Sequence, residues 1–278
     1  MTEPARGRTD GPGMPVAVVM PAYNEAESLP VFLAEIAESL RPVVSSLHFV
    51  VVDDLSTDST AAVLEELRIV GAEVVSVRSP SNRGHGPTAL NAYREGLLLD
   101  VDVIIHVDGD GQFIGSDFRR ALAALHGADV VHGVRTSRTD PWFRRVITAV
   151  TSFVAALLAG HRIPDVNTPL RVYRRPAIER LISLIPESSL VPHIHFSLLE
   201  RAQDLRVHYV RVQSIPRRGA SVLGTMWNGS GERRPALPSG RLLRFSRDAA
   251  LEVLRLRVLR LRPALSGSGE HGTRRRTT

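Results

Sequence analysis

The chain has 278 residues, with 43% hydrophobic and 23% charged side chains and a formal net charge of +6. This length and composition suffice for a full hydrophobic core, and they favour one α/β domain with a C-terminal extension over two independent domains. The sequence contains no cysteine, which excludes disulfides, a cysteine nucleophile and a thiolate metal site.

The first predicted elements are a strand and the helix that follows it. Residues 1–14 are polar and lack the apolar core of a secretory signal peptide, so we expect a disordered tail. Residues 15–22 are β-rich and predict a strand. Ser28, Leu29 and Pro30 predict the start of a helix, because Pro is favoured near the first helical position.

The order of strand and helix then recurs. Residues 48–54 are an apolar run that predicts a strand, and residues 60–70 predict the helix after it. A third strand over residues 73–77 leads through the Gly-rich residues 82–86 into a helix over residues 87–98. Strands that alternate with helices predict a mainly parallel sheet with helices on both faces.

The fourth predicted strand begins at Val103 and ends in two carboxylates one residue apart, Asp108 and Asp110. Residues i and i+2 of an extended chain point to the same side, so both carboxylates can reach one cation. Oxygen ligands suit Mg²⁺ or Mn²⁺. Taken alone, the pair is equally compatible with an acidic turn after a strand.

Polar residues at the carboxyl ends of all four strands favour a ligand site. In open sheets of this kind, ligands bind beyond the carboxyl ends of the strands. Four separate connections deliver such residues to one edge. They are Glu25, Asp53, Asp54, the loop of residues 84–86, Asp108 and Asp110.

Four successive motifs resemble those of family 2 glycosyltransferases with the GT-A fold. They lie at residues 20–25, 52–58, 108–112 and 133–135. Their order and spacing are most similar to dolichol-phosphate mannose synthases and bacterial polyprenyl-phosphate sugar transferases, and the match runs from about Val16 to Ser221. The resemblance implies a Rossmann-like GT-A domain over residues 15–222. It also implies transfer of a sugar, with inversion, from a UDP- or GDP-sugar to an acceptor, for which a polyprenyl phosphate is favoured.

The resemblance assigns a nucleotide pocket to the first two motifs. Pro21, Tyr23 and Glu25 would line this pocket. Asp54, with Asp53 beside it, would bind the base or the ribose.

The resemblance also implies the site of the donor diphosphate. Asp108, Asp110 and Gln112 would hold Mg²⁺ or Mn²⁺ against it, and Gly109 belongs to the same donor-binding loop. Arg135 matches an arginine of the family that is expected near the diphosphate, so Asp110 and Arg135 are candidate catalytic residues.

Two later segments also match the family. Residues 165–174 resemble its acceptor-side segment, and residues 216–221 resemble a late motif in which an arginine binds phosphate. Either Arg217 or Arg218 fits that arginine, and we favour Arg218 as the third catalytic candidate. Leu55, where the family commonly has Gly, and Leu170, where an aromatic residue is usual, put the loop shape and the acceptor in doubt.

The acceptor decides whether a general base is needed. A divalent cation and guanidinium groups stabilise a leaving diphosphate, and a phosphate acceptor is already ionised. A hydroxyl acceptor needs a carboxylate or a His within reach of its proton. His193, His195 and Glu200 are the candidates, but we expect packing or surface roles for the histidines and a solvated or capping role for Glu200.

Two apolar or basic segments bear on membrane contact. Residues 146–160 are too short for a membrane span and predict a helix that either docks a polyprenyl tail or packs on the sheet. Residues 241–262 predict a basic amphipathic helix, which either lies on anionic lipid or packs on the domain. We expect a linker over residues 223–240, a disordered tail over 263–278, and a cytoplasmic protein at the inner face of the plasma membrane.

Two other function classes fit the sequence less well. A nucleotidyltransferase would normally have a Gly-rich loop with a Lys after the first strand, where this chain has Tyr23, Asn24 and Glu25. A nucleic-acid-binding protein would explain the charge, but aromatic residues make up only 5% of the chain and no stacking motif is visible. We therefore expect no nucleic-acid partner.

Overall fold

The computed structural model describes residues 13–136, 164–165, 168–218 and 240–260. The chain divides into two units, and helix α8 (Gly240–Arg260) is the described part of the second, so each unit is described by itself. The helix predicted over residues 146–160 lies outside the described residues. The predicted domain boundaries therefore stay predictions.

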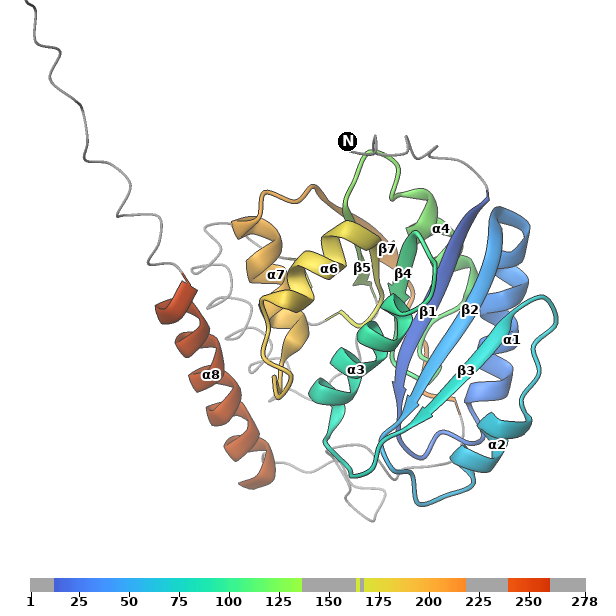
Figure 1. Ribbon diagram of the computed structural model, residues 1–278, viewed down its shortest axis with the longest axis horizontal. Coiled ribbons are helices and arrows are strands. Elements are labelled where there is room, and N and C mark those ends of the chain that lie inside the picture. The colour runs from blue at the N-terminus through green and yellow to red at the C-terminus, as the bar shows by residue number, and fades with distance from the viewer. Residues whose placement is uncertain (1–12, 137–163, 166–167, 219–239, 261–278) are drawn as a thin grey trace, which may run out of the picture. The chain divides into compact units, whose positions relative to one another are not determined.

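The first unit alternates strands and helices along the chain (Figure 1). The strands are β1 (Met14–Ala22), β2 (Val44–Asp53), β3 (Glu73–Arg78), β4 (Val103–His106), β5 (Val130–Arg135), β6 (Arg171–Arg174) and β7 (Val207–Val212). The helices are α1 (Leu29–Leu40), the 3-10 turn η1 (Arg41–Val43), α2 (Thr60–Glu66), α3 (His85–Leu97), α4 (Gly115–Ala123), α6 (Arg175–Ser183) and α7 (Pro192–Ala202).

The strands form one seven-stranded sheet in the order β3-β2-β1-β4-β6-β5-β7. Neighbouring strands run parallel except at β6, which is antiparallel to both β4 and β5. The prediction of a mainly parallel α/β sheet is therefore confirmed. The reversed strand β6 is new, because its four residues fall inside the segment that was interpreted only as acceptor-side sequence.

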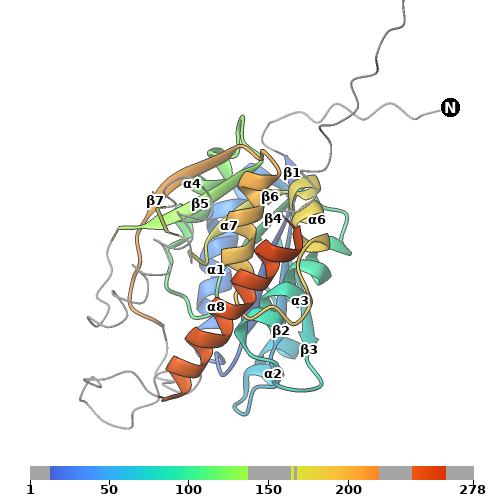
Figure 2. The same ribbon diagram turned by 90° about the vertical axis from the view of Figure 1, so that its left-hand side faces the viewer.

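Helices cover both faces of the sheet (Figures 1 and 2). On one face α1 packs with α4, and on the other α3 packs with α6 and α7. Strand β1 is buried on both faces, which explains its unbroken apolar run. Gly96 lets α3 approach this strand closely, because a Cβ atom there would lie 2.5 Å from Val19 Cγ1. This tight core fixes the positions of the strand ends.

Some helix boundaries differ from the predicted ones. The helix after β2 ends at Glu66, not at residue 70, because the chain turns back and Ile69 pairs with Ala72. Helix α3 begins at His85, two residues before the predicted start. Helix α8 begins at Gly240, one residue before its predicted start. None of the described helices combines the length and the apolar composition that a membrane-spanning segment requires.

Candidate active site

The register of three neighbouring strands places the chemistry at one sheet edge. His106 of β4 and His132 of β5 both pair with Arg171 of β6, so the three residues form a row across the sheet. Asp108 follows His106, and Arg135 follows His132, so both lie beyond this row. Because β6 runs the opposite way, the segment that precedes Arg171 reaches the same edge.

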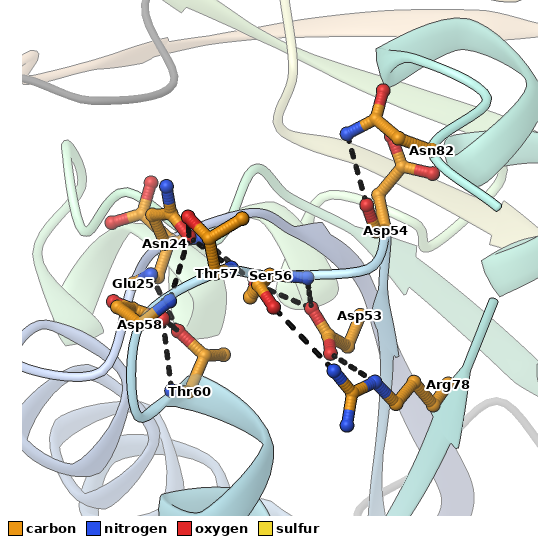
Figure 3. Close-up of polar contacts among 10 residues, drawn as sticks. All are labelled: Asn24, Glu25, Asp53, Asp54, Ser56, Thr57, Asp58, Thr60, Arg78 and Asn82. Atoms are coloured by element: carbon orange, nitrogen blue, oxygen red, sulfur yellow. Dashed lines mark hydrogen bonds and ion pairs between the residues drawn. The ribbon is translucent and has the colours of Figure 1, made fainter. Parts of the chain in front are cut away.

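The loops after β1 and β2 are joined side by side (Figure 3). Asn24 accepts a hydrogen bond from the backbone N–H of Thr57 at 2.8 Å, and its own N–H donates to Ser56 Oγ at 2.9 Å. The N–H of Glu25 donates to Thr60 Oγ1 at 2.9 Å. These contacts fix the backbone on which Glu25 stands. The sequence analysis missed the three hydroxyl side chains in this role, although they follow the second strand directly.

Asp54 holds the loop that precedes α3. Its two carboxylate oxygens accept the N–H groups of Arg83 and Gly84, each at 2.8 Å. Its backbone carbonyl accepts a hydrogen bond from Asn82 Nδ2 at 3.0 Å (Figure 3). A carboxylate can accept about four hydrogen bonds. The two bonds from Arg83 and Gly84 therefore leave acceptor positions free for a hydroxyl or N–H group of a nucleotide. The predicted role of Asp54 in binding the base or ribose stays a prediction.

Asp53 is fully buried and turns away from Asp54. It accepts the backbone N–H of Ser56 at 2.9 Å and lies 3.5 Å from Arg78 Nε (Figure 3). Leu55, which directly follows the two acids, has a φ of 60°. This left-handed conformation costs a non-Gly residue about 1–2 kcal/mol, so the loop takes the shape that Gly would favour. Leu55 therefore adopts a backbone conformation that suits the Gly common at this position in the family.

The side chain of Glu25 links three segments of the edge. Its Oε2 atom accepts a hydrogen bond from Ser28 Oγ at 2.9 Å, and Ser28 Oγ lies 3.2 Å from the carbonyl of Gly109. Its Oε1 atom pairs with Arg217. Burial raises the pKa of Glu25 to about 7, although Arg217 and Ser28 act in the opposite direction. Pro21 completes the contact, because its carbonyl accepts the N–H of Gly109 at 3.3 Å.

The raised pKa of Glu25 predicts a pH-dependent stability. The folded chain holds this proton more tightly than the unfolded chain between pH 4.5 and pH 7, so the free energy of unfolding falls as pH rises through that window. Glu25→Gln has no such proton, and we expect its stability relative to the parent chain to rise by about 1–3 kcal/mol from pH 4.5 to pH 7.5. Urea unfolding at both pH values measures this.

Glu27→Gln is the matched control, since Glu27 lies exposed in the same loop. Its stability relative to the parent should stay constant with pH. If the stability of Glu25→Gln relative to the parent also stays constant with pH, Glu25 is not a buried carboxyl with a raised pKa.

Asp108 and Asp110 form a half-buried acidic pair. Burial, together with the charge of Asp108, raises the pKa of Asp110 to about 6. Asp108 Oδ1 is buried and has no hydrogen-bond partner among the described residues, and His85 Nε2 lies 3.5 Å from it. Two repelling carboxylates with an unsatisfied oxygen suit a divalent cation. Mg²⁺ typically binds one or two carboxylates and completes its shell with water and phosphate oxygens.

The described part of the chain has no cluster of three acidic or His side chains arranged around a metal position. Gln112 donates its backbone N–H to Asp110 Oδ1 at 3.3 Å, which orients the carboxylate. The predicted contribution of the Gln112 side chain stays a prediction.

Residues 213–218 run along the acidic loop and are bonded to it. Ile215 donates its N–H to the carbonyl of Gln112 at 3.0 Å, and Arg218 donates its N–H to the carbonyl of Asp110 at 3.1 Å. Gly111 has a φ of 68°, and a Cβ atom there would meet the Arg218 side chain at 2.8 Å. The late motif is thus held beside the predicted metal ligands.

The two arginines of the late motif point to different surroundings. Arg217 pairs with Glu25, and its charge offsets part of the rise in the pKa of Asp110. Its Nε atom is buried and has no hydrogen-bond partner within the described segments. Arg218 instead pairs with Glu35.

Arg218 also packs against the domain. Its Nη2 atom donates to the carbonyl of Phe113 at 3.2 Å, and its guanidinium carbon lies 5.5 Å from the centre of the Phe32 ring. Arg217 therefore faces the acidic cluster, while Arg218 packs against α1.

Arg135 is held at the same edge by Asp165. The guanidinium donates from Nε to Asp165 Oδ2 at 2.9 Å and from Nη2 to Oδ1 at 3.1 Å. This bidentate contact orients the arginine and joins the end of β5 to the start of the acceptor-side segment. The strand register thus brings Arg135 to the edge that carries the acids.

The candidate bases on α7 are buried beneath the edge. His193 packs against the ring of His106, with 4.4 Å between ring centres, and His195 is 0% exposed. These contacts agree with the expected packing role of the histidines. The expectation that Glu200 is solvated or capping is wrong, because α7 turns it inward, where it is 2% exposed and bonded to His132 at 3.0 Å.

The model of the family described as "Glycosyl transferase family 2" matches residues 17–182. The chain belongs to glycosyltransferase family 2. Leu170, at the position where an aromatic residue is usual in the family, is 0% exposed and packs in the hydrophobic core.

Two curated members of family 2 are similar in sequence. An undecaprenyl-phosphate 4-deoxy-4-formamido-L-arabinose transferase of Proteus mirabilis is 29% identical over 194 residues, which cover 69% of this chain and 59% of that protein. A polyprenol monophosphomannose synthase of Mycolicibacterium smegmatis is 32% identical over 171 residues, which cover 59% of this chain and 63% of that protein. The chain thus spans about three-fifths of the length of these relatives.

Solved structures share the GT-A fold. Glucosyl-3-phosphoglycerate synthase from Mycobacterium tuberculosis, in complex with Mn²⁺, UDP and glucosyl-3-phosphoglycerate, matches with a TM-score of 0.58 and 18% identity over 92% of this chain and 86% of that chain. The mannosyltransferase PcManGT from Pyrobaculum calidifontis, in complex with GDP-Man and Mn²⁺, matches with a TM-score of 0.52 and 21% identity over 74% and 59% of the two chains. The predicted fold is therefore confirmed.

Proposed function

We propose that the chain transfers a sugar from a nucleotide-diphosphate donor to a polyprenyl phosphate, with Mg²⁺ or Mn²⁺ at Asp108 and Asp110. One observation carries this proposal. Two of the buried polar atoms that lack a hydrogen-bond partner among the described residues lie at this edge beside the acidic loop, the acceptor Asp108 Oδ1 and the donor Arg217 Nε. A metal-bound diphosphate supplies a cation for the first and an anion for the second.

The donor side follows from the two joined loops. Asp53 and Asp54 lie at the end of β2 and would bind the base or ribose, with Pro21 and Tyr23 lining the pocket. The UDP and GDP-Man in the complexes of the two solved neighbours support a UDP- or GDP-sugar. Pocket residues that no motif fixes would choose between them.

The chemistry requires stabilisation of a leaving diphosphate. The bound cation supplies Lewis-acid stabilisation of the developing charge. Arg217, and Arg135 oriented by Asp165, would donate to the same oxygens, and arginine keeps its charge at every working pH. Arg218 stays a prediction for this role, and the side-chain directions support Arg217. We propose inversion by single displacement, as the resemblance to the family implies.

The engagement of the edge carboxylates supports a phosphate acceptor. Asp54 accepts two backbone N–H groups and Asp165 holds Arg135. A phosphate acceptor arrives ionised and needs none of these groups as a base. The names of the two curated relatives, which act with undecaprenyl phosphate and a polyprenol, support the lipid class.

A hydroxyl acceptor is the second candidate, and one observation favours it. Glu25 has a pKa of about 7, which is suited to a general base at neutral pH. Its carboxylate must first leave Arg217 to take a proton. Transfer to a soluble hydroxyl acceptor that is lost in Glu25→Gln would assign this role to Glu25.

Peripheral membrane contact belongs to the proposal. Helix α8 carries Arg244 and Arg247 on an exposed face, and Leu251 is 44% exposed. Basic amphipathic helices bind anionic lipid surfaces. The inner face of the plasma membrane would present both the anionic lipid and the polyprenyl phosphate.

One assay separates the acceptors. The protein is incubated with Mn²⁺ and labelled UDP- or GDP-sugars, with either polyprenyl phosphate in vesicles or a soluble hydroxyl acceptor. We expect an acid-labile lipid product that is lost when EDTA removes the metal. Label only in soluble product would reverse the order of the two candidates, and no transfer with any donor would contradict both.

A further inference from the structure

A buried ionic network lies beneath the edge and has no part in the proposed chemistry. It comprises Arg171 and Tyr173 of β6, His132 of β5, and Ser197 and Glu200 of α7, all at most 3% exposed. Apolar residues of similar size are often as stabilising as a buried ion pair, so such a network is weak support for stability alone. Because burying these charges costs desolvation free energy, the network is a candidate for orienting a residue of the site.

The network converges on one oxygen of Glu200. Tyr173 Oη and His132 Nε2 each lie 3.0 Å from Oε1, and Arg171 Nη1 lies 3.5 Å away. Burial raises the pKa of Glu200, but His132, Arg171 and Tyr173 together lower it below its usual value. We place the His132 proton on Nε2, because a carboxylate is the strongest acceptor within reach. Glu200 is therefore an ionised hub.

Arg171 carries the network towards the edge. Its Nη2 atom donates to Ser197 Oγ at 3.0 Å, and its Nε atom donates to the carbonyl of Thr168 at 3.1 Å. Glu200 and Ser197 thus fix the guanidinium from the helix side. The guanidinium in turn fixes a backbone carbonyl in the segment before β6.

Thr168 joins this carbonyl to the catalytic candidates. Its hydroxyl donates to the carbonyl of Gly133 on β5, and its N–H donates to the carbonyl of Asp165 at 3.3 Å. The Asp165 carboxylate then holds Arg135 through the bidentate contact. A continuous set of contacts therefore runs from Glu200 through Arg171, Thr168 and Asp165 to the Arg135 guanidinium.

We propose that Glu200 is a positioning residue, which orients the Arg135 guanidinium towards the diphosphate through Arg171 and the turn of Thr168 and Asp165. The inference rests on the proposed function, since it places Arg135 beside the leaving diphosphate. Glu200 itself touches no substrate. Its loss should therefore lower kcat while leaving the affinity for the metal–nucleotide donor unchanged.

A double-mutant cycle tests the coupling. Glu200→Gln keeps the shape but removes the charge, and we expect kcat to fall about tenfold with the donor KM unchanged. In an Asp165→Asn background, where the hold on Arg135 is already weakened, the same change should cost less than twofold. Glu179→Gln is the control, because Glu179 is an exposed acid of α6 that pairs with Arg175 outside the network.

A second readout does not depend on turnover. Arg135 Nε–H, assigned in NMR spectra by its loss in Arg135→Lys, should exchange slowly in the parent chain and faster in Glu200→Gln. This readout holds even if no sugar is transferred, so a failed transfer assay contradicts the proposed function and leaves the positioning role measurable. Equal tenfold losses in both backgrounds, or unchanged kcat and unchanged exchange, would overturn the inference.

Tyr173→Phe keeps the test open if Glu200→Gln does not fold. It removes one hydrogen bond to Glu200 and retains the aromatic ring, which packs against Phe196 with 5.9 Å between ring centres. We expect a smaller loss of kcat, about threefold, that again disappears in the Asp165→Asn background. If Tyr173→Phe lowers kcat equally in both backgrounds, the proposed coupling is contradicted, as it would be by equal losses in Glu200→Gln.

Discussion

Asp110→Asn is expected to lower metal-dependent sugar transfer by about three orders of magnitude, which corresponds to about 4 kcal/mol of transition-state stabilisation. The amide keeps the size of the side chain but removes the charge that would bind the cation. Asp110 stands at the end of β4 and outside the apolar core, so the fold should be retained. Transfer of labelled sugar at saturating Mn²⁺ measures the loss.

The same variant should be more stable than the parent without metal. The raised pKa of Asp110 means that its ionisation above pH 6 opposes folding. Asp110→Asn removes this cost at pH 8, and it should also abolish the rise in Tm that Mn²⁺ causes in the parent chain. Asp100→Asn is the control, because Asp100 is exposed before β4. Retained transfer with a retained Mn²⁺ response would rule out the metal assignment.

Arg217→Ala is expected to lower transfer by about two to three orders of magnitude, because the half-buried guanidinium, which we propose contacts the leaving diphosphate, would act mainly in the transition state. The loss should appear in kcat, with the CD spectrum of the folded chain unchanged. Arg217→Lys should recover only part of it, since an ammonium cannot reproduce the planar, bidentate donors. Rates with the nucleotide sugar and polyprenyl phosphate measure both variants.

Arg218→Ala is the matched comparison. It removes the pair with Glu35 and the contact with the Phe32 ring, so we expect a loss of about 1–2 kcal/mol in the free energy of unfolding. Transfer should fall much less than in Arg217→Ala. If Arg218→Ala instead keeps its stability and loses transfer, the choice favoured by the sequence pattern alone holds, and Arg217 only neutralises Glu25.

Much of the sheet could be predicted because its signals are local. The apolar runs that end at Ala22, Asp53 and His106 are buried on both faces, so each run stands out without knowledge of its neighbours. Strand β6 lacks such a run. Its Arg171 and Tyr173 are buried in the polar network, and their spacing alone does not distinguish a buried strand from a solvated loop.

The candidate site was predictable only where its residues follow one strand directly. Asp108 and Asp110 follow one strand directly, so their common position follows from the strand itself. The inward orientation of Glu200 was not predictable, because it depends on His132, 68 positions away along the chain. The choice between Arg217 and Arg218 likewise depends on contacts with α1 and with Glu25 in the loop after β1, which no local sequence pattern predicts.

The bidentate contact between Arg135 and Asp165 closes the base of the chain segment that connects β5 to β6. The two ends of this segment are therefore joined at the edge of the sheet. Because the entropy cost of closing a loop grows only slowly with its length, substitutions and insertions inside the segment should leave the strand register intact.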